Sequence, residues 1–136
     1  MATFNKFQCF VGDLGDKVHD LDGDVLKVYL TNATPSASDD SVKTDLAEIT
    51  AENGYPSGGT DIQNVWSETG GTGTLTGTDV VFTGTGTFGP FRYIVIYNDT
   101  STSDSLIGYA DYGSAISVND GETFTVDFGA TILTLT

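Results

Sequence analysis

Short runs in which apolar and polar residues alternate limit the folds open to this chain more than any other feature. The clearest run is TFTVDF at 123–128, where every second residue is Phe or Val. Residues 26–30 and 133–136 repeat the pattern. Because successive side chains of a β-strand point to opposite faces of a sheet, a period of two predicts strands with one buried face. Glycines between such runs mark turns and bulges, so we expect a chain made mostly of strands.

The most apolar run lies at 91–97, where Arg92 is the one charged residue. Such a run predicts a central strand that is covered on both faces. Residues 106–109 are its expected partner across the polar loop 98–105. Farther along, Asp-Gly at 120–121 predicts a hairpin turn, because Gly takes the positive φ that a tight turn needs.

Alternation also predicts a strand at 7–11. Cys9 lies in this run, and we expect it to be a small buried hydrophobe rather than a reactive thiol. A single cysteine allows no disulfide within the chain. One short helix is expected around residues 42–49, with Ser41 as the residue that begins it.

Short strands at 74–76 and 80–83, inside a Gly- and Thr-rich stretch, bring the expected total to about eight around one core. The length of 136 residues is normal for one domain. We therefore predict an all-β protein, a single antiparallel β-sandwich domain spanning 1–136, jelly-roll-like and with at most one short helix. A closed barrel is the alternative.

The charge of the chain excludes several kinds of partner. The formal net charge is −14, from 19 acidic and 5 basic residues, and the basic residues do not cluster in the sequence. Nucleic acid and anionic lipid would repel such a surface. No apolar run is long enough to span a membrane, and residues 1–6 lack the apolar stretch of a signal peptide. We expect synthesis in the cytoplasm without export by that route.

The residues needed for common catalytic and metal sites are scarce. The chain has one histidine, His19, and no Gly-x-Ser-x-Gly motif to position a nucleophile. We expect His19 to be a surface or turn residue. A zinc site needs about four Cys, His or carboxylate ligands, and the chain offers one Cys and one His. The sequence therefore predicts no enzymatic activity, no cofactor and no bound metal.

Three weaker patterns have ordinary explanations. The acidic segment 13–24 has clustered carboxylates that could hold calcium, but it lacks the spacing and flanking helices of an EF-hand, so an acidic solvated turn is expected. The stretch 84–89 fits G-x-G-x-x-G, but Pro90 and a strand-like run follow it instead of a helix. Nothing in their spacing singles out a catalytic pair among the four glutamates, which are Glu48, Glu52, Glu68 and Glu122.

Aromatic residues are the remaining candidates for binding. Trp66, Tyr55, Tyr109 and Tyr112 could form a platform on which sugars stack, or part of a protein interface. They could equally belong to the core. We expect a core or subunit-interface role, with the sugar platform as the alternative.

Several stretches together match a pattern found in one group of proteins. They are MATFNKF at 1–7 with VHDL at 18–21, LKVYLTN at 26–32 followed by Ala33-Thr34-Pro35, KTDLAEI at 43–49 leading to Asn53-Gly54-Tyr55, GPFRY at 89–93 through Asn98-Asp99-Thr100 to LIGY at 106–109 and Asp111-Tyr112-Gly113, and GETFTVDF at 121–128. With these residues the chain resembles a widespread family of small structural proteins of tailed bacteriophages. The stretches leave out the centre of the chain at 56–85, and none is a catalytic signature.

The resemblance implies a structural role in the virion, and most specifically a capsid decoration (cement) protein. Such proteins commonly form trimers on the outer capsid, so the implied partners are the major capsid protein and further copies of this chain. Oligomerisation would cover sheet edges, threefold symmetry would let weak contacts add, and the negative charge would keep particles dispersed. The alternative is a tail or head-fibre component that binds host-surface glycans.

Overall fold

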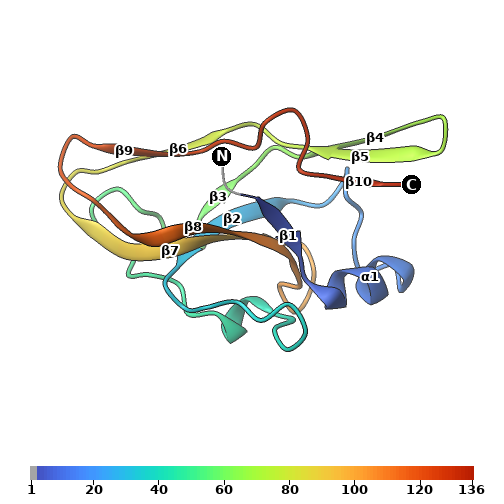
Figure 1. Cartoon of the computed structure of the whole chain (residues 1–136), viewed down its shortest axis with the longest axis horizontal. Coiled ribbons are helices and arrows are strands. Elements are labelled where there is room, and N and C mark those ends of the chain that lie inside the picture. The colour runs from blue at the N-terminus through green and yellow to red at the C-terminus, as the bar shows by residue number, and fades with distance from the viewer. Residues whose placement is uncertain (1–2) are drawn as a thin grey trace.

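The apolar run predicted to be a central strand lies in the middle of the largest sheet. In the computed structural model, which describes residues 3–136, this strand is β7 (Phe88–Asn98). It lies between β8 (Leu106–Val118) and β2 (Leu26–Thr31), and β1 (Phe4–Lys6) and β3 (Thr60–Asp61) form the two edges. All neighbours are antiparallel, in the order β1-β8-β7-β2-β3 (Figure 1).

Two smaller sheets form a second layer over this one (Figure 1). A three-stranded sheet has the order β10-β5-β4, and a two-stranded sheet pairs β6 with β9. Their strands are β4 (Val65–Thr69), β5 (Thr72–Thr76), β6 (Val80–Thr83), β9 (Thr123–Val126) and β10 (Leu133–Leu135). The predicted fold class, an all-β sandwich-like domain with antiparallel sheets and one short α-helix, is confirmed.

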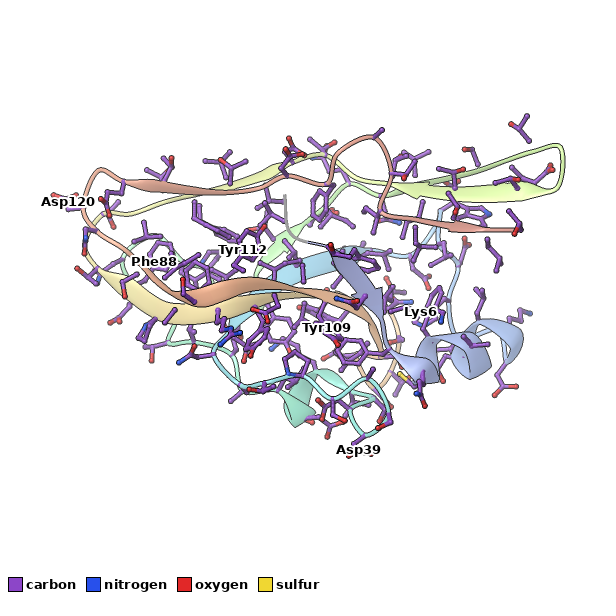
Figure 2. The ribbon with its side chains drawn as sticks, in the orientation of Figure 1. Lys6, Asp39, Phe88, Tyr109, Tyr112 and Asp120 are labelled. Carbon is purple, nitrogen blue, oxygen red and sulfur yellow. The ribbon has the colours of Figure 1, made fainter. Side chains whose placement is uncertain are left out.

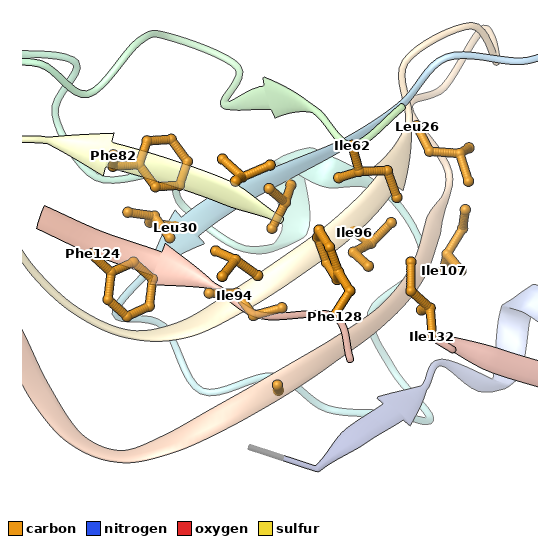
Figure 3. Packing of buried hydrophobic residues seen from close by; sticks show 14 of the residues in the cluster. Leu26, Leu30, Ile62, Phe82, Ile94, Ile96, Ile107, Phe124, Phe128 and Ile132 are labelled. Carbon is orange, nitrogen blue, oxygen red and sulfur yellow. The ribbon is translucent and has the colours of Figure 1, made fainter. Parts of the chain in front are cut away.

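The main core fills the space between the two layers. Leu30, Ile94 and Ile96 of the large sheet face Phe82 and Phe124 of the smaller sheets (Figure 3). All five side chains are at most 9% exposed. Burying a Leu, Ile or Phe side chain stabilises a fold by about 1.5–3 kcal/mol. The contacts between these buried side chains therefore hold the two layers together.

A second core covers the opposite face of the large sheet. Tyr29, Val95 and Tyr97 point to this face, and Leu46 from the loop that follows β2 packs on them. The loop contains one 3₁₀ turn, η1 (Lys43–Asp45), in place of the helix predicted at 42–49. Asp45 Oδ2 accepts the Ser41 and Val42 N–H groups and so begins the turn. The turn ends at once because the next residue is extended and the chain then bonds to β2.

The strand predicted at 7–11 is wrong: the chain there forms α1 (Gln8–Gly15), the one α-helix of the described residues. Phe7 and Phe10 are buried and Leu14 packs on the core, and these positions follow the spacing of a helix. In a short run, Phe7, Cys9 and Val11 also satisfy a period of two, and two glycines lower the helix propensity. The tertiary contacts of Phe10 and Leu14 favour the helix over the strand.

The Asp-Gly turn forms, but the hairpin predicted from it is wrong. Glu122 N–H donates to Asn119 O at 3.0 Å, and Gly121 has a φ of 81°. The two flanking strands do not pair with each other, because β9 pairs with β6 while β8 pairs with β1 and β7. The turn instead carries the chain from one layer to the other.

Candidate functional site

The histidine of the chain is buried, so the prediction that it lies at the surface is wrong. His19 is 7% exposed, and its Nδ1 lies 3.0 Å from Nδ2 of Asn98. The amide oxygen of Asn98 accepts the backbone N–H groups of Thr100 and Ser101, so the NH₂ group must face the ring. Nδ1 therefore accepts a hydrogen bond and the proton of the neutral ring is on Nε2.

This geometry differs from that of a catalytic triad, in which Nδ1 donates to a carboxylate. Burial lowers the pKa of His19, against smaller opposing effects of Asp13 and Asp24. Nε2 has no hydrogen-bond partner among the described residues. The imidazole ring is therefore neutral and buried, and Nε2–H is its hydrogen-bond donor.

The carboxylates of the acidic segment hold its own backbone. Asp20 Oδ1 accepts N–H groups from Asp22 and Gly23, at 3.2 and 2.9 Å. Asp22 Oδ1 accepts the N–H of Trp66 at 3.1 Å and so ties this turn to β4. Within residues 3–136, no group of three or more His, Cys, Asp or Glu side chains lies close enough to hold a metal ion.

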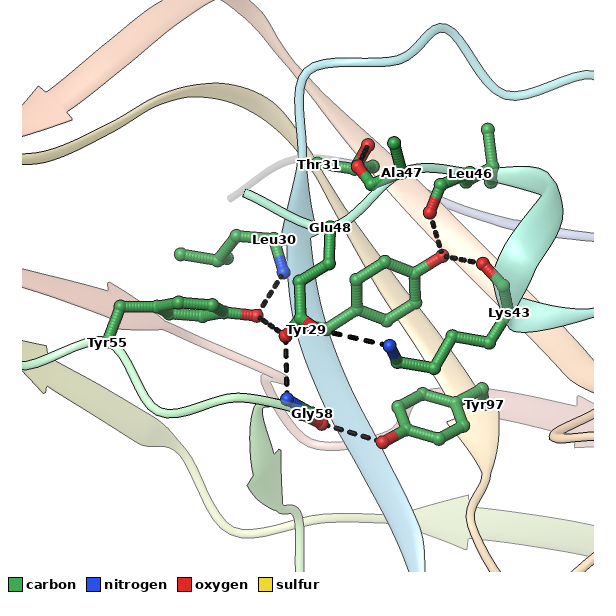
Figure 4. A network of polar contacts seen from close by, with 10 residues as sticks. All are labelled: Tyr29, Leu30, Thr31, Lys43, Leu46, Ala47, Glu48, Tyr55, Gly58 and Tyr97. Atoms are coloured by element: carbon green, nitrogen blue, oxygen red, sulfur yellow. Dashed lines mark hydrogen bonds and ion pairs between the residues drawn. The ribbon is translucent and has the colours of Figure 1, made fainter. Parts of the chain in front are cut away.

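The Glu48 carboxylate, which is largely buried, also makes its hydrogen bonds within the fold (Figure 4). It accepts hydrogen bonds from Tyr55 Oη, from Gly58 N–H at 2.8 Å and from Lys43 Nζ at 3.1 Å. Burial, with Glu48 beside it, raises the pKa of Tyr55, which keeps this phenol protonated and donating. Tyr55 Oη in turn accepts the N–H of Leu30. The network fastens the loop after β2 to the large sheet and leaves no free acid.

The other sequence candidates do not form a site. The G-x-G-x-x-G stretch leads directly into β7, so no helix N-terminus is present there to hold a pyrophosphate. Glu68 and Glu122 accept backbone N–H groups of their own turns. Glu52 is exposed and lies in the loop between β2 and β3.

The four aromatic candidates do not share a surface. Tyr55 is in the main core, where it packs on Phe82. Tyr112 points between the layers, whereas Tyr109 lies on the other side of β8 near α1 (Figure 2). Trp66 borders a recess that none of the other three candidates lines. A common sugar platform of these side chains is therefore not formed.

That recess is an apolar crevice lined by residues of α1 and of the three-stranded sheet. The strands β4, β5 and β10 of this sheet extend past the large sheet there (Figure 1). We call this recess the α1–β10 crevice. Its narrow part has a volume of about 100 Å³ and adjoins a wider part of about 490 Å³; Leu14, Trp66 and Leu135 line both parts. The apolar walls of the narrow part are Phe10, Val11, Leu14, Trp66, Leu133 and Leu135.

Apolar side chains remain exposed around this crevice. Val11 is 58% and Leu135 is 49% exposed. Trp66 is half-buried and its ring lies against Gly73, where a Cβ would come within 2.1 Å of the ring. Contiguous exposed apolar surface of this kind is typical of a binding site for another protein or ligand.

Two lysines give the crevice a charge opposite to that of the whole chain. Three of the five cations form ion pairs, namely Lys27 with Asp99, Lys43 with Glu48 and Arg92 with Asp111. Lys6 and Lys17 form none among the described residues. Lys6 lines the narrow part of the crevice, between α1 and β10 (Figure 2), and Lys17 lines the wide part.

A separate polar hollow lies on the other side of α1. It has a volume of about 530 Å³ and is lined by Cys9, by Ser41 and by the hydroxyl-rich loop 100–103. Burial and then Asp13 raise the pKa of the Cys9 thiol, so it stays protonated. The thiol is half-buried on the helix, not in a strand as predicted, and no aromatic ring lines the hollow to stack on a sugar.

Sequence reasoning found one wall of the crevice and missed the others. Trp66 was a candidate from its residue type alone. The helical spacing of Phe10 and Leu14 was a further signal, hidden by the alternation of residues 7–11. That β10 faces α1 could not be seen in the sequence, because the two segments are more than a hundred residues apart.

No family model, curated protein or solved structure matches the chain. Within residues 3–136, no helix has the length and apolar character needed to cross a membrane. We therefore infer the function from the α1–β10 crevice and from the sequence stretches described above.

Proposed function

We propose that this protein is a structural protein of a bacteriophage virion that binds, through the α1–β10 crevice, to the outer surface of the major capsid protein lattice and stabilises the head. In this proposal it is a non-enzymatic decoration protein, made in the bacterial cytoplasm and assembled as a homotrimer. The observation that carries the proposal is the exposed apolar crevice of Val11, Trp66 and Leu135.

The rest of the structure is compatible with this role. Asp20, Glu48 and His19 each make side-chain hydrogen bonds within the fold. The edges of the sheets at β1, β3, β4 and β10 have no further strand partner among the described residues, and subunit contacts in a trimer would cover some of them. A net charge of −14 would keep decorated particles apart.

The second candidate function is binding of host-surface glycans by a tail or head fibre. Trp66 favours it, because this ring lines a recess of about 490 Å³ together with Asp20. Indole rings stack on sugars and carboxylates accept their hydroxyl groups. A glycan array with the wild-type protein and with Trp66→Ala tests this candidate directly.

The test of the main proposal is binding to heads that were assembled without this protein. Val11→Glu places a charge at the crevice, and Val81→Glu is the matched control, because Val81 is 56% exposed on β6, away from the crevice. We expect cosedimentation of wild type and Val81→Glu with the heads, and its loss for Val11→Glu. Failure of the wild type to bind heads, with glycan binding that needs Trp66, would overturn the proposal in favour of the second candidate.

A further inference from the structure

The α1–β10 crevice combines three features that together define the chemistry of an occupant. Its walls are apolar, its one charged wall residue in the narrow part is Lys6, and one side of it is a sheet edge. We propose that the crevice takes an extended segment of a partner protein that carries apolar side chains and a carboxylate. This inference rests on the proposed function, because it names the part of the partner that this site binds.

The extended conformation follows from β10. This strand pairs with β5 on one side and has no strand on the other within the described residues. Leu133, Thr134 and Leu135 all line the crevice, so β10 borders it along its whole length. A segment that adds to such an edge gains main-chain hydrogen bonds, and its alternate side chains enter the neighbouring pocket.

The apolar side chains of the segment would meet Val11 on one wall and Trp66 on the other. Val11 is 58% exposed and belongs to a helix whose other apolar residues face the core. An apolar side chain seated between these walls removes both from water, and each Å² of apolar surface so covered contributes about 25 cal/mol. The walls therefore select an apolar residue.

The carboxylate follows from the charges of the crevice. Lys6 and Lys17 are the cations of the described residues that have no acidic partner, and they lie at the two parts of the same recess. No acid lines the narrow part. Asp20 lines the wide part and keeps its negative charge, so the two lysines leave the crevice as a whole with a net positive charge. An acidic residue of the partner would thus find its counter-ion here and be repelled elsewhere on this acidic protein.

The experiment compares charge reversals in binding to heads that lack this protein. Lys6→Glu and Lys17→Glu remove the proposed counter-ions, and Lys27→Glu is the control, because Lys27 pairs with Asp99 outside the crevice. We expect each crevice reversal to weaken binding by about tenfold at low salt, with less effect at high salt, and the control to change it little. Amide exchange at residues 133–135 should slow when heads are bound, because the free edge of β10 becomes paired.

The possible outcomes separate this inference from the proposed function. If Val11→Glu abolishes binding while both lysine reversals leave it unchanged, the crevice still binds the head but the carboxylate is refuted. If exchange at 133–135 stays fast in the bound state, the strand-like segment is refuted. If the reversals change the oligomeric state in sedimentation without changing the affinity for heads, the occupant is a second copy of this chain and the inference fails.

Discussion

Asn98 donates a hydrogen bond from Nδ2 to Nδ1 of His19, and the 3.0 Å contact is buried. The same NH₂ group donates to Asp24 Oδ2 at 2.8 Å, so both of its hydrogens are used. Protonation of His19 would place an N–H group against this NH₂ group. The contact thus holds the ring in its neutral form, and burial acts in the same direction by lowering the pKa of His19.

Stability should therefore fall as the pH falls below about 6.5, the pKa of an unfolded histidine. Below that pH the unfolded chain binds a proton that the folded chain refuses, so the free energy of unfolding decreases, by at most about 1.4 kcal/mol per pH unit. Urea unfolding at several pH values between 7.5 and 5.5 measures the effect. His19→Gln should lack this loss, because the chain has no other histidine. An NMR titration that gives folded His19 a pKa of 6.5 or higher would refute the explanation.

Gly12 and Gly113 form a matched pair that tests the helix found in place of a strand. A Cβ at either position meets nothing within 4 Å, but Gly113 has a φ of +87° whereas Gly12 lies inside α1. Gly12→Ala should raise the free energy of unfolding by about 0.5–1 kcal/mol, the usual gain in a helix interior. Gly113→Ala should lower it by about 1 kcal/mol or more, because Ala is strained at positive φ. No gain for Gly12→Ala in urea unfolding would contradict the helix.

The strands were predictable where the local sequence pattern fitted a strand better than a helix. Residues 91–97 favoured a strand covered on both faces, since the run is short and rich in Ile, Val and Tyr. Residues 7–11 fitted both the period of a strand and the spacing of a helix. The contacts of Phe10 with the core favour the helix. The Asp-Gly turn was predictable from its chemistry, but which strands pair depends on contacts between layers that the turn does not encode.

The candidate site was less predictable than the fold. Its walls come from α1, β4 and β10, and each wall alone looks like an ordinary amphipathic segment. The structure was needed to show that Lys6 and Lys17 lack an acidic partner, whereas the other three cations form ion pairs. In the sequence all five cations were equally isolated.

The Glu48 network should contribute more to stability than an exposed ion pair of similar geometry. In Glu48→Gln an amide NH₂ replaces one oxygen and faces donors, because Tyr55, Gly58 and Lys43 all donate to this side chain. With the Glu48 side chain only 15% exposed, we expect a loss of about 1–3 kcal/mol in urea unfolding. Asp111→Asn is the control, since the Asp111–Arg92 pair is exposed and should matter far less. Equal effects of the two substitutions would show that the network is not buried as described.

Gly73 should be needed for the position of Trp66 in the crevice. Its backbone lies in a regular strand without a positive φ, so the reason for Gly here is space: a Cβ would come within 2.1 Å of the indole ring. Gly73→Ala must push the ring toward solvent, with an expected loss of about 1–3 kcal/mol from overpacking. Because Trp66 is the only tryptophan, its fluorescence reports the change as a red shift of the emission maximum. Thr74→Ala introduces the same residue one position along, on the other face of β5, and should leave the emission maximum in place. If Gly73→Ala also leaves it in place, Trp66 does not lie against Gly73, and the wall that it forms in the α1–β10 crevice is placed wrongly.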